Sequence, residues 1–144
     1  MTAGNQLTKG VAQVGDLQFV GGAKATKTAK VTMTAATGAG AALSWVNPEG
    51  ATIIVTGVAI HITTESGAAT TIDVGTTAVS GTTSSDNLID GASTAATAPV
   101  TLASPVGTNG RGAQHLEAGD WVTGSITGTI GSFAGTAYIS YVLA

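Results

Sequence analysis

The residues able to do chemistry are few, and their spacing gives little support to a catalytic or metal centre. The chain has two histidines, His61 and His115, and no cysteine. Zinc sites need three or four ligands held close together, commonly Cys and His at short spacings, and neither histidine has such a neighbour in the sequence. We therefore expect His61, which is flanked by Ile60 and Ile62, to be a packed or interface residue.

Two groups of carboxylates are further candidates. Asp73 lies in the sequence Ile-Asp-Val-Gly, which is similar to the Asp-Thr-Gly of aspartic proteases, but that chemistry needs two carboxylates sharing one proton. We expect Asp73 to end a strand and to accept N–H bonds from the turn that follows. The segment 84–91, SSDNLIDG, offers oxygen ligands for calcium, although the spacing of an EF-hand is absent; the alternative is a turn capped by its own side chains.

No motif for an enzyme or a nucleotide site is present. The chain has no Gly-x-Ser-x-Gly elbow, and neither 21–22 nor 38–40, both rich in glycine, leads into the Gly-Lys-Ser/Thr of a phosphate loop. The net charge is −3, whereas a nucleic-acid-binding protein presents a basic face. We expect no enzymatic activity, no cofactor and no nucleic-acid partner.

Strands rather than helices must position these residues. Gly or β-branched residues recur every few positions and no stripe with helical period is sustained. The sequence predicts an all-β jelly roll or β-sandwich of about eight strands. The expected strands are 28–35, 43–46, 52–64, 70–74, 99–103, 113–117, 121–130 and 136–143.

The clearest strand is 52–64, which follows the turn Asn47-Pro48-Glu49-Gly50. Strict alternation places Ile54, Val58, Ile60 and Ile62 on one face, and Ile53, Val55, Ala59 and His61 on the other. Segment 75–98 is expected to be a long excursion without a strand, and 104–112 a second loop. Near the end of the chain, Gly119-Asp120 predicts a tight turn with Leu116 and Val122 closing the core on either side.

Charge divides the chain into two parts. Residues 1–30 carry four lysines against one aspartate, a net charge of +3, whereas residues 31–144 carry one arginine against seven carboxylates, a net charge of −6. Five apolar residues within 1–27 would need something to pack on; they are Val11, Val14, Leu17, Phe19 and Val20. We expect an N-terminal arm at 1–27, which docks on an acidic surface, and a body at 28–144; a solvated, solubilising tail is the alternative.

Composition excludes several classes of protein. The apolar run at 53–55 is interrupted by Thr56 and Gly57, far short of the roughly 20 residues of a membrane-spanning helix, so we expect no membrane partner. The N-terminus, MTAGNQLTKG, has no apolar core of a secretory signal. A protein made in a cytoplasm, yet rich in Thr, Ser, Gly and Ala like proteins built for exposure, fits a viral structural protein.

The sequence resembles the decoration (cement) proteins of tailed bacteriophages over roughly residues 28–144. The segments that carry the likeness are the run from Trp45 through NPEGATIIVTGVAIHITTESGAATTIDVGTTA, then SSDNLIDG and LEAGDWVTGSI. This resemblance implies a homotrimer that binds the major capsid protein on the capsid exterior, after assembly in the host cytoplasm. It implies that arms bridge capsomers and stabilise the shell, without catalytic residues.

Two sets of contact residues follow from these expectations. Capsid contacts of the arm are predicted at Lys9, Phe19, Lys24, Lys27 and Lys30. Trimer contacts are predicted at Trp45, His61, Trp121 and Tyr141. The main alternative is a head- or tail-fibre module that binds a receptor or glycan, which would expose the tryptophans and tyrosines in a groove; a secreted matrix protein and an enzyme of unrecognised type are the others.

Overall fold

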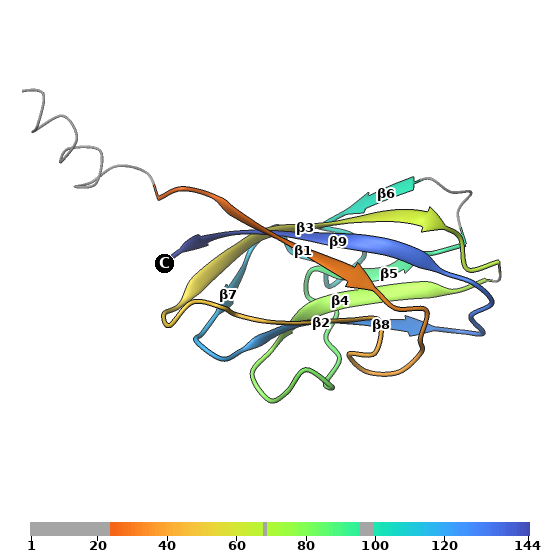
Figure 1. Cartoon of the computed structure of the whole chain (residues 1–144), viewed down its shortest axis with the longest axis horizontal. Coiled ribbons are helices and arrows are strands. Elements are labelled where there is room, and N and C mark those ends of the chain that lie inside the picture. Colours follow the sequence, from red (N-terminus) through yellow and green to blue (C-terminus); the bar gives the residue numbers. More distant parts are fainter. Residues whose placement is uncertain (1–23, 68, 96–99) are drawn as a thin grey trace, which may run out of the picture.

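Nine strands carry the fold of the described residues, which are 24–67, 69–95 and 100–144, without the side chain of Val100, in a computed structural model. All the strand pairs are antiparallel, and they form two sheets that pack face to face (Figure 1). The strands are β1 (Lys27–Met33), β2 (Leu43–Val46), β3 (Ile53–Thr64), β4 (Thr71–Thr77), β5 (Ile89–Ser93), β6 (Val100–Ala103), β7 (Gln114–Leu116), β8 (Trp121–Thr127) and β9 (Ala134–Leu143).

The strand order is that of a jelly roll with one added strand. The first sheet has the order β1-β9-β3-β6, with the short β7 also paired to β3, and the second has the order β2-β8-β4-β5. Leaving β7 aside, the first strand pairs with the last, the second with the next to last, and so on inward to β4 with β5. This nesting is the double-sheet jelly roll, so the expected all-β class is confirmed.

The core lies between the sheets and consists mainly of aliphatic side chains. Ile53, Val55, Val58, Ile60 and Ile62 of β3 are buried, and so are residues of the facing strands, among them Ile72, Val74, Val122 and Ile126. The expectation that Leu116 and Val122 close the core beside the Gly119 turn is confirmed: both are buried, and Gly119 has φ of 87°. Each aliphatic side chain buried in this way stabilises the fold by about 1.5–3 kcal/mol.

The expected alternation in β3 was wrong in one respect. Ile53 and Val55 share the inward face with Val58 and Ile60, whereas strict alternation separates these two pairs. The pairing of β3 with β9 shifts register between Val55 and Gly57. This bulge adds one residue, so the inward face moves from odd to even positions.

One strand was missed in the segment 75–98. β4 continues to Thr77, and β5 occupies Ile89–Ser93. Leu88 and Ile89 are fully buried, but Asp90 and Gly91 follow them, and Gly91 has φ of 68°. Because Asp and Gly are depleted in strands, β5 carries a weak sequence signal and owes its conformation to its pairing with β4.

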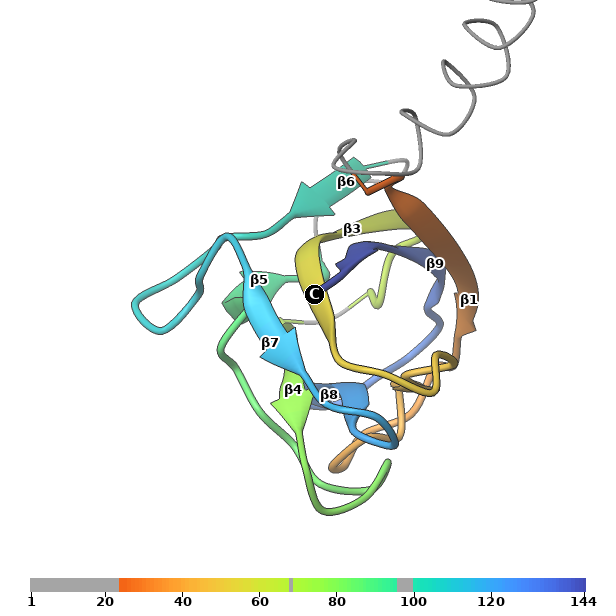
Figure 2. The ribbon, with the colours of Figure 1, turned by 90° about the vertical axis from the view of Figure 1, so that its left-hand side faces the viewer.

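Both ends of the described chain lie at the same end of the sandwich, which we call the arm end (Figures 1 and 2). There, the Lys24 ammonium donates a hydrogen bond to the carbonyl of Ala144, and the Ala144 N–H donates to the Thr52 carbonyl at 3.1 Å. The turns that join β2 to β3 and β7 to β8 are at this end too (Figure 2). The sequence segment predicted to be an arm therefore joins the body beside the C-terminus.

Candidate functional site

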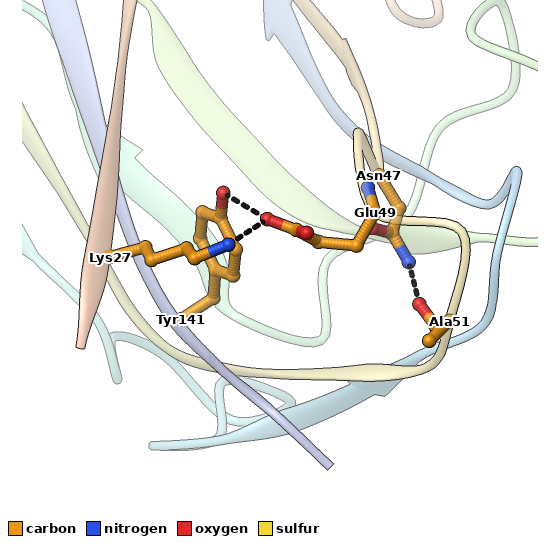
Figure 3. Close-up of polar contacts among 5 residues, drawn as sticks. All are labelled: Lys27, Asn47, Glu49, Ala51 and Tyr141. Atoms are coloured by element: carbon orange, nitrogen blue, oxygen red, sulfur yellow. Dashed lines mark hydrogen bonds and ion pairs between the residues drawn. The ribbon is translucent and has the colours of Figure 1, made fainter. Parts of the chain in front are cut away.

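The start of β1 is fastened to the β2–β3 turn by a cluster of three polar side chains (Figure 3). The Glu49 Oε1 accepts a hydrogen bond from the Lys27 ammonium at 2.6 Å and one from the Tyr141 hydroxyl at 3.1 Å. The side chain of Lys27 is 45% exposed and that of Glu49 is 22% exposed. The cluster thus fixes Lys27, the first residue of β1, against the β2–β3 turn.

The three groups change one another's titration. The hydrogen bond from Lys27 lowers the pKa of Glu49, and the same bond raises the pKa of Lys27. The pKa of Tyr141 is raised, first because burial disfavours the phenolate and second because its hydroxyl donates to Glu49. Each shift favours the form that makes the cluster: carboxylate, ammonium and neutral phenol.

Asn47 holds the turn that carries Glu49. Its side-chain oxygen accepts a hydrogen bond from the Glu49 N–H at 2.9 Å, and its amide group donates to the carbonyls of Ala51 at 3.0 Å, Glu117 at 2.8 Å and Leu116 at 3.3 Å. Asn47 is 5% exposed. The β2–β3 and β7–β8 turns are thereby tied to each other through one buried amide (Figure 3 shows the bond to Ala51).

The predicted arm contacts lie at different places. Lys24 and Lys27 are at the arm end, and Lys30 is exposed further along β1, paired across the sheet with Tyr138. Lys9 and Phe19 lie outside the described residues. The three lysines within the described part of the chain are therefore on β1 or just before it, at one edge of the first sheet.

The outward side of β1, β9, β3 and β6, which we call the β1–β6 face, is polar and built from small side chains. Tyr138 is 37% exposed and lies between Lys30 of β1 and Ala59 of β3. The His61 Nδ1 is 3.3 Å from the hydroxyl of Thr101, its partner on β6. The face comprises Thr28, Lys30, Thr32, Thr136, Tyr138, Ser140, Ala59, His61, Thr101 and Ala103.

Charge is segregated between the two sheets. The strands β1, β9, β3 and β6 contain Lys27, Lys30 and His61 and no Asp or Glu. The strands of the second sheet contain Asp73 and Asp90 and no Lys or Arg. Lysines thus lie on strands of the first sheet and aspartates on strands of the second, although Lys27 forms an ion pair with Glu49 of the β2–β3 turn.

The aromatic residues predicted as trimer contacts do not gather on one surface. Trp45 points into the sandwich, where its ring centroid is 5.4 Å from that of Tyr141, and Tyr141 is 6% exposed. Trp121 lies on the outward side of the second sheet, opposite Val46 in the register, with Gly81 against its ring. His61 is on the β1–β6 face.

The aspartates of the second sheet accept backbone hydrogen bonds, Asp73 from the neighbouring strand β5 and Asp90 from the loop after β6. Asp73 Oδ1 accepts the Gly91 N–H at 2.7 Å, but the expected strand end and turn donor were wrong, because Asp73 lies in the middle of β4 and Gly91 lies in β5. Asp90 accepts the N–H groups of Thr108 and Asn109 at 3.0 Å. Within the described ranges no three His, Asp or Glu side chains gather so as to hold a metal ion.

An open hollow of about 230 Å³ lies beside Asp73. It is lined by Asp73, Ser84, Ser85 and Asp86. Its groups are hydrogen-bonding oxygens, and no aromatic side chain lines it. Such a set of carboxylates and hydroxyls can bind hydroxyl groups through hydrogen bonds.

Comparisons with known proteins give structural likenesses. The fold matches a chain of the acid-stable capsid of Helicobacter pylori bacteriophage KHP30 with a TM-score of 0.52 and 13% identity, covering 84% of this chain and 90% of that one. It matches a chain of the capsid of Ralstonia phage GP4 with a TM-score of 0.52 and 17% identity, covering 85% and 86%. No family model and no curated protein matches the sequence. At such low sequence identity, the structural matches show a shared fold.

Proposed function

We propose that this protein is a virion structural protein that binds the outside of a phage capsid as a homotrimer and stabilises it by bridging capsomers. The main support is the pair of structural likenesses, both to chains from phage capsids. Because each match covers most of both chains, those capsid chains are close in length to this one. The likeness is therefore to whole small chains, as expected of a component added to a shell.

The segregated charge supports a particular orientation on the capsid. Lys24 and Lys30 are exposed beside the β1–β6 face, and the strands of that face carry no carboxylate that would repel an acidic surface. We assign this face to the major capsid protein, with Lys9 and Phe19 of the arm contacting the next capsomer. Several linked contacts per trimer then add avidity, and outward pressure has to break them together.

The trimer contacts are assigned to the side chains that the single chain leaves accessible. Trp45 and Tyr141 mainly support the core of one subunit, because their rings face each other inside the sandwich. Trp121 and His61 remain partly exposed, and cyclic symmetry lets different surfaces of one chain meet around a threefold axis. The function is mechanical and includes no reaction.

The proposal is tested by co-sedimentation with capsids that lack this protein. We expect the purified chain to be a trimer of about 42 kDa, three times 13.9 kDa, by light scattering, and to sediment with capsids. Replacing Lys24 and Lys30 by alanine should weaken binding roughly tenfold at low salt, with less effect at high salt because salt screens exposed charges. Arg111→Ala is the matched control. A monomer that does not sediment with capsids contradicts the proposal.

The hollow beside Asp73 and Asp86 favours a second candidate, a fibre module that binds a glycan. Carboxylates and hydroxyls are suitable partners for sugar hydroxyl groups. A glycan array with the full chain, followed by calorimetry on any hit, separates the two functions. Binding that is lost in Asp86→Ala, in a protein that ignores capsids, would favour the fibre module.

A further inference from the structure

We propose that the open edge of β1 binds an extended, acidic segment of the major capsid protein, which adds to the first sheet as a further strand beside β1. The inference rests on the proposed function, because it names the contact by which the capsid is held. In strand addition of this kind, main-chain hydrogen bonds join the two proteins, and the side chains of alternate residues determine which partner is accepted.

β1 is the longest edge strand in the described part of the chain. It lies at one edge of the first sheet, with β6 and β7 at the other edge, and β2 and β5 are the edges of the second sheet (Figure 2). β1 has seven residues in unbroken register with β9, whereas β2 and β6 have four each. The edge of β5 is covered, because the Asp90 N–H donates to the Val106 carbonyl at 2.9 Å. A long, regular strand with an unpaired edge can accept a further strand.

Three residues of β1 direct their backbone groups towards the open edge. The Ser140 carbonyl accepts a hydrogen bond from the Thr56 hydroxyl of β3 at 3.1 Å, so even-numbered residues of β9 face β3 and odd-numbered ones face β1. The register pairs the odd-numbered residues of β1 with the odd-numbered residues of β9. The N–H and C=O groups of Thr28, Lys30 and Thr32 therefore point away from β9, and no described residue bonds to them.

The side chains of β1 indicate what kind of strand fits beside it. On the inner side, Ala29 and Val31 are half-buried and pack against the core. On the outer side, Lys30 is exposed and forms no ion pair within the described ranges, where the paired lysine is Lys27. An added strand would place one row of side chains beside Ala29 and Val31 and the other row beside Lys30. This arrangement fits a segment that alternates apolar and polar residues, with Asp or Glu opposite Lys30.

Lys30 also disfavours a second copy of this chain as the added strand. Two β1 strands that pair antiparallel over their full length bring Lys30 opposite Lys30 of the other copy. Like charges in such a position are destabilising, and lysine is a common means by which edge strands avoid pairing with themselves. A carboxylate in the added strand removes the repulsion, so one side chain rejects copies of the chain and accepts an acidic partner.

Proline substitution at the open edge tests the inference. Thr32→Pro removes an N–H that faces this edge and keeps the hydrogen bonds from β1 to β9, and proline is tolerated at such positions of edge strands. We expect the variant to bind roughly tenfold more weakly in co-sedimentation with capsids that lack this protein. Circular dichroism and urea unfolding check that it keeps the β-sandwich.

Thr101→Pro is the matched control at the opposite edge of the same sheet. The Val58 carbonyl accepts the Ser104 N–H at 2.9 Å, so the even-numbered residues of β3 face β6. Thr101 pairs with the odd-numbered His61, and its N–H therefore points away from β3. Because Thr101 is exposed on the β1–β6 face, its replacement by proline should leave binding unchanged if the edge of β1 holds the partner. Equal binding by the two proline variants overturns the inference.

Hydrogen exchange of the unmodified chain, followed at single amides by mass spectrometry, gives a test without a substitution. The amides of Thr28, Lys30 and Thr32 should exchange fast in the free protein and roughly tenfold more slowly on the capsid, whereas that of Thr101 should not change. Protection already present in the free protein overturns the inference. Unchanged exchange in a protein that sediments with capsids overturns it as well but leaves the proposed function standing. A protein that does not sediment with capsids contradicts both.

Substitutions of Lys30 test the acidic character of the partner. Lys30→Glu should bind capsids roughly fivefold more weakly than Lys30→Ala at low salt, because it places like charges opposite each other, and Lys30→Arg should bind as the wild type does. The differences should shrink at high salt, which screens exposed charges. Equal binding by Lys30→Glu and Lys30→Arg contradicts an acidic partner.

Discussion

At the residue scale, Asn47 satisfies more backbone groups than its size suggests. Its side chain forms hydrogen bonds with four backbone groups, and the residue is almost completely buried. The sequence predicted a turn at Asn47-Pro48-Glu49-Gly50 from Pro and Gly preferences. It could not predict the bonds to Leu116 and Glu117, which lie 69 and 70 residues away.

Asn47→Ala should destabilise the protein by roughly 2–3 kcal/mol, because several buried backbone groups lose their partner at once. Urea unfolding monitored by circular dichroism measures the change. Asn109→Ala, which removes an exposed asparagine with one hydrogen bond to Asp86, is the control and should cost less than about 1 kcal/mol. Equal losses for the two variants would contradict the role assigned to Asn47.

The Lys27–Glu49–Tyr141 cluster makes stability depend on pH at both extremes. The pKa values of Lys27 and Tyr141 are raised in the folded state, so their contribution is full below the unfolded values near 10.5 and 10.0 and is lost as the pH rises through the folded values. The pKa of Glu49 is lowered, so its contribution is present above the unfolded value near 4.5 and is lost as the pH falls through the folded value.

Tyr141→Phe should flatten the alkaline side of this profile. The ring still packs on Trp45, but the hydroxyl that ionises in the unfolded chain is gone. We expect the urea midpoint of the wild type to fall more steeply than that of Tyr141→Phe between pH 9 and pH 11. Tyr138→Phe is the matched control, and a variant profile identical to that of the wild type argues against the cluster.

At the scale of elements, the loop between β4 and β5 is shaped by glycines that admit close backbone contact. A Cβ on Gly75 would lie 2.5 Å from the Ser85 hydroxyl and 2.6 Å from the Asn87 side-chain oxygen. Asn87 in turn accepts the Thr76 N–H at 2.9 Å and donates to the Thr76 hydroxyl at 2.9 Å. The loop therefore packs directly on β4, and this packing requires that residue 75 has no side chain.

Gly75→Ala should cost about 1–3 kcal/mol, since the methyl group has to displace this loop. Gly57→Ala is the matched control: it lies within a strand, and its nearest heavy atom would be 3.6 Å from the new Cβ. Thermal unfolding of the two variants should differ clearly in midpoint. If Gly75→Ala is as stable as Gly57→Ala, the close packing described here is wrong.

The elements also show how far sequence reasoning reached. Strong alternation of β-branched residues located β3, β8 and β9 within a few residues of their ends. The bulge in β3 and the short strand β5 were not predicted, because both depend on pairing with other strands rather than on the local sequence pattern. The same limit applies to the surfaces: Val46 and Trp121 are 75 residues apart, yet they lie opposite each other in the register of β2 with β8.

At the scale of the whole molecule, the two sheets differ in charge and, in our proposal, in what they contact. The sequence allowed the asymmetry between residues 1–30 and 31–144 to be counted, but not its direction in space. That direction depends on the jelly-roll nesting, which puts β1 next to β9 in the first sheet and β4 next to β5 in the second. Roles in a trimer or on a capsid remain predictions.

Reversing the charge of the β1–β6 face tests the orientation. Thr32→Glu with Thr101→Glu should weaken capsid binding at least tenfold, because both side chains are exposed on the face assigned to the shell. Ser93→Glu with Thr127→Glu places the same charges on the second sheet and should leave binding unchanged. Co-sedimentation at low salt measures both, and the opposite ranking would mean that the second sheet faces the capsid.

The proximity of Lys24 and Ala144 has a practical consequence for engineering. A peptide or fluorescent domain appended after Ala144 would emerge beside Lys24, where it would compete for space with any partner bound at this end of the sandwich. An epitope intended for display belongs at the opposite pole, for instance in the connection between β8 and β9, where Thr129 and Ser132 are exposed. The same adjacency suits a circular permutant, since a short linker from Ala144 to Lys24 closes the ring without crossing either sheet.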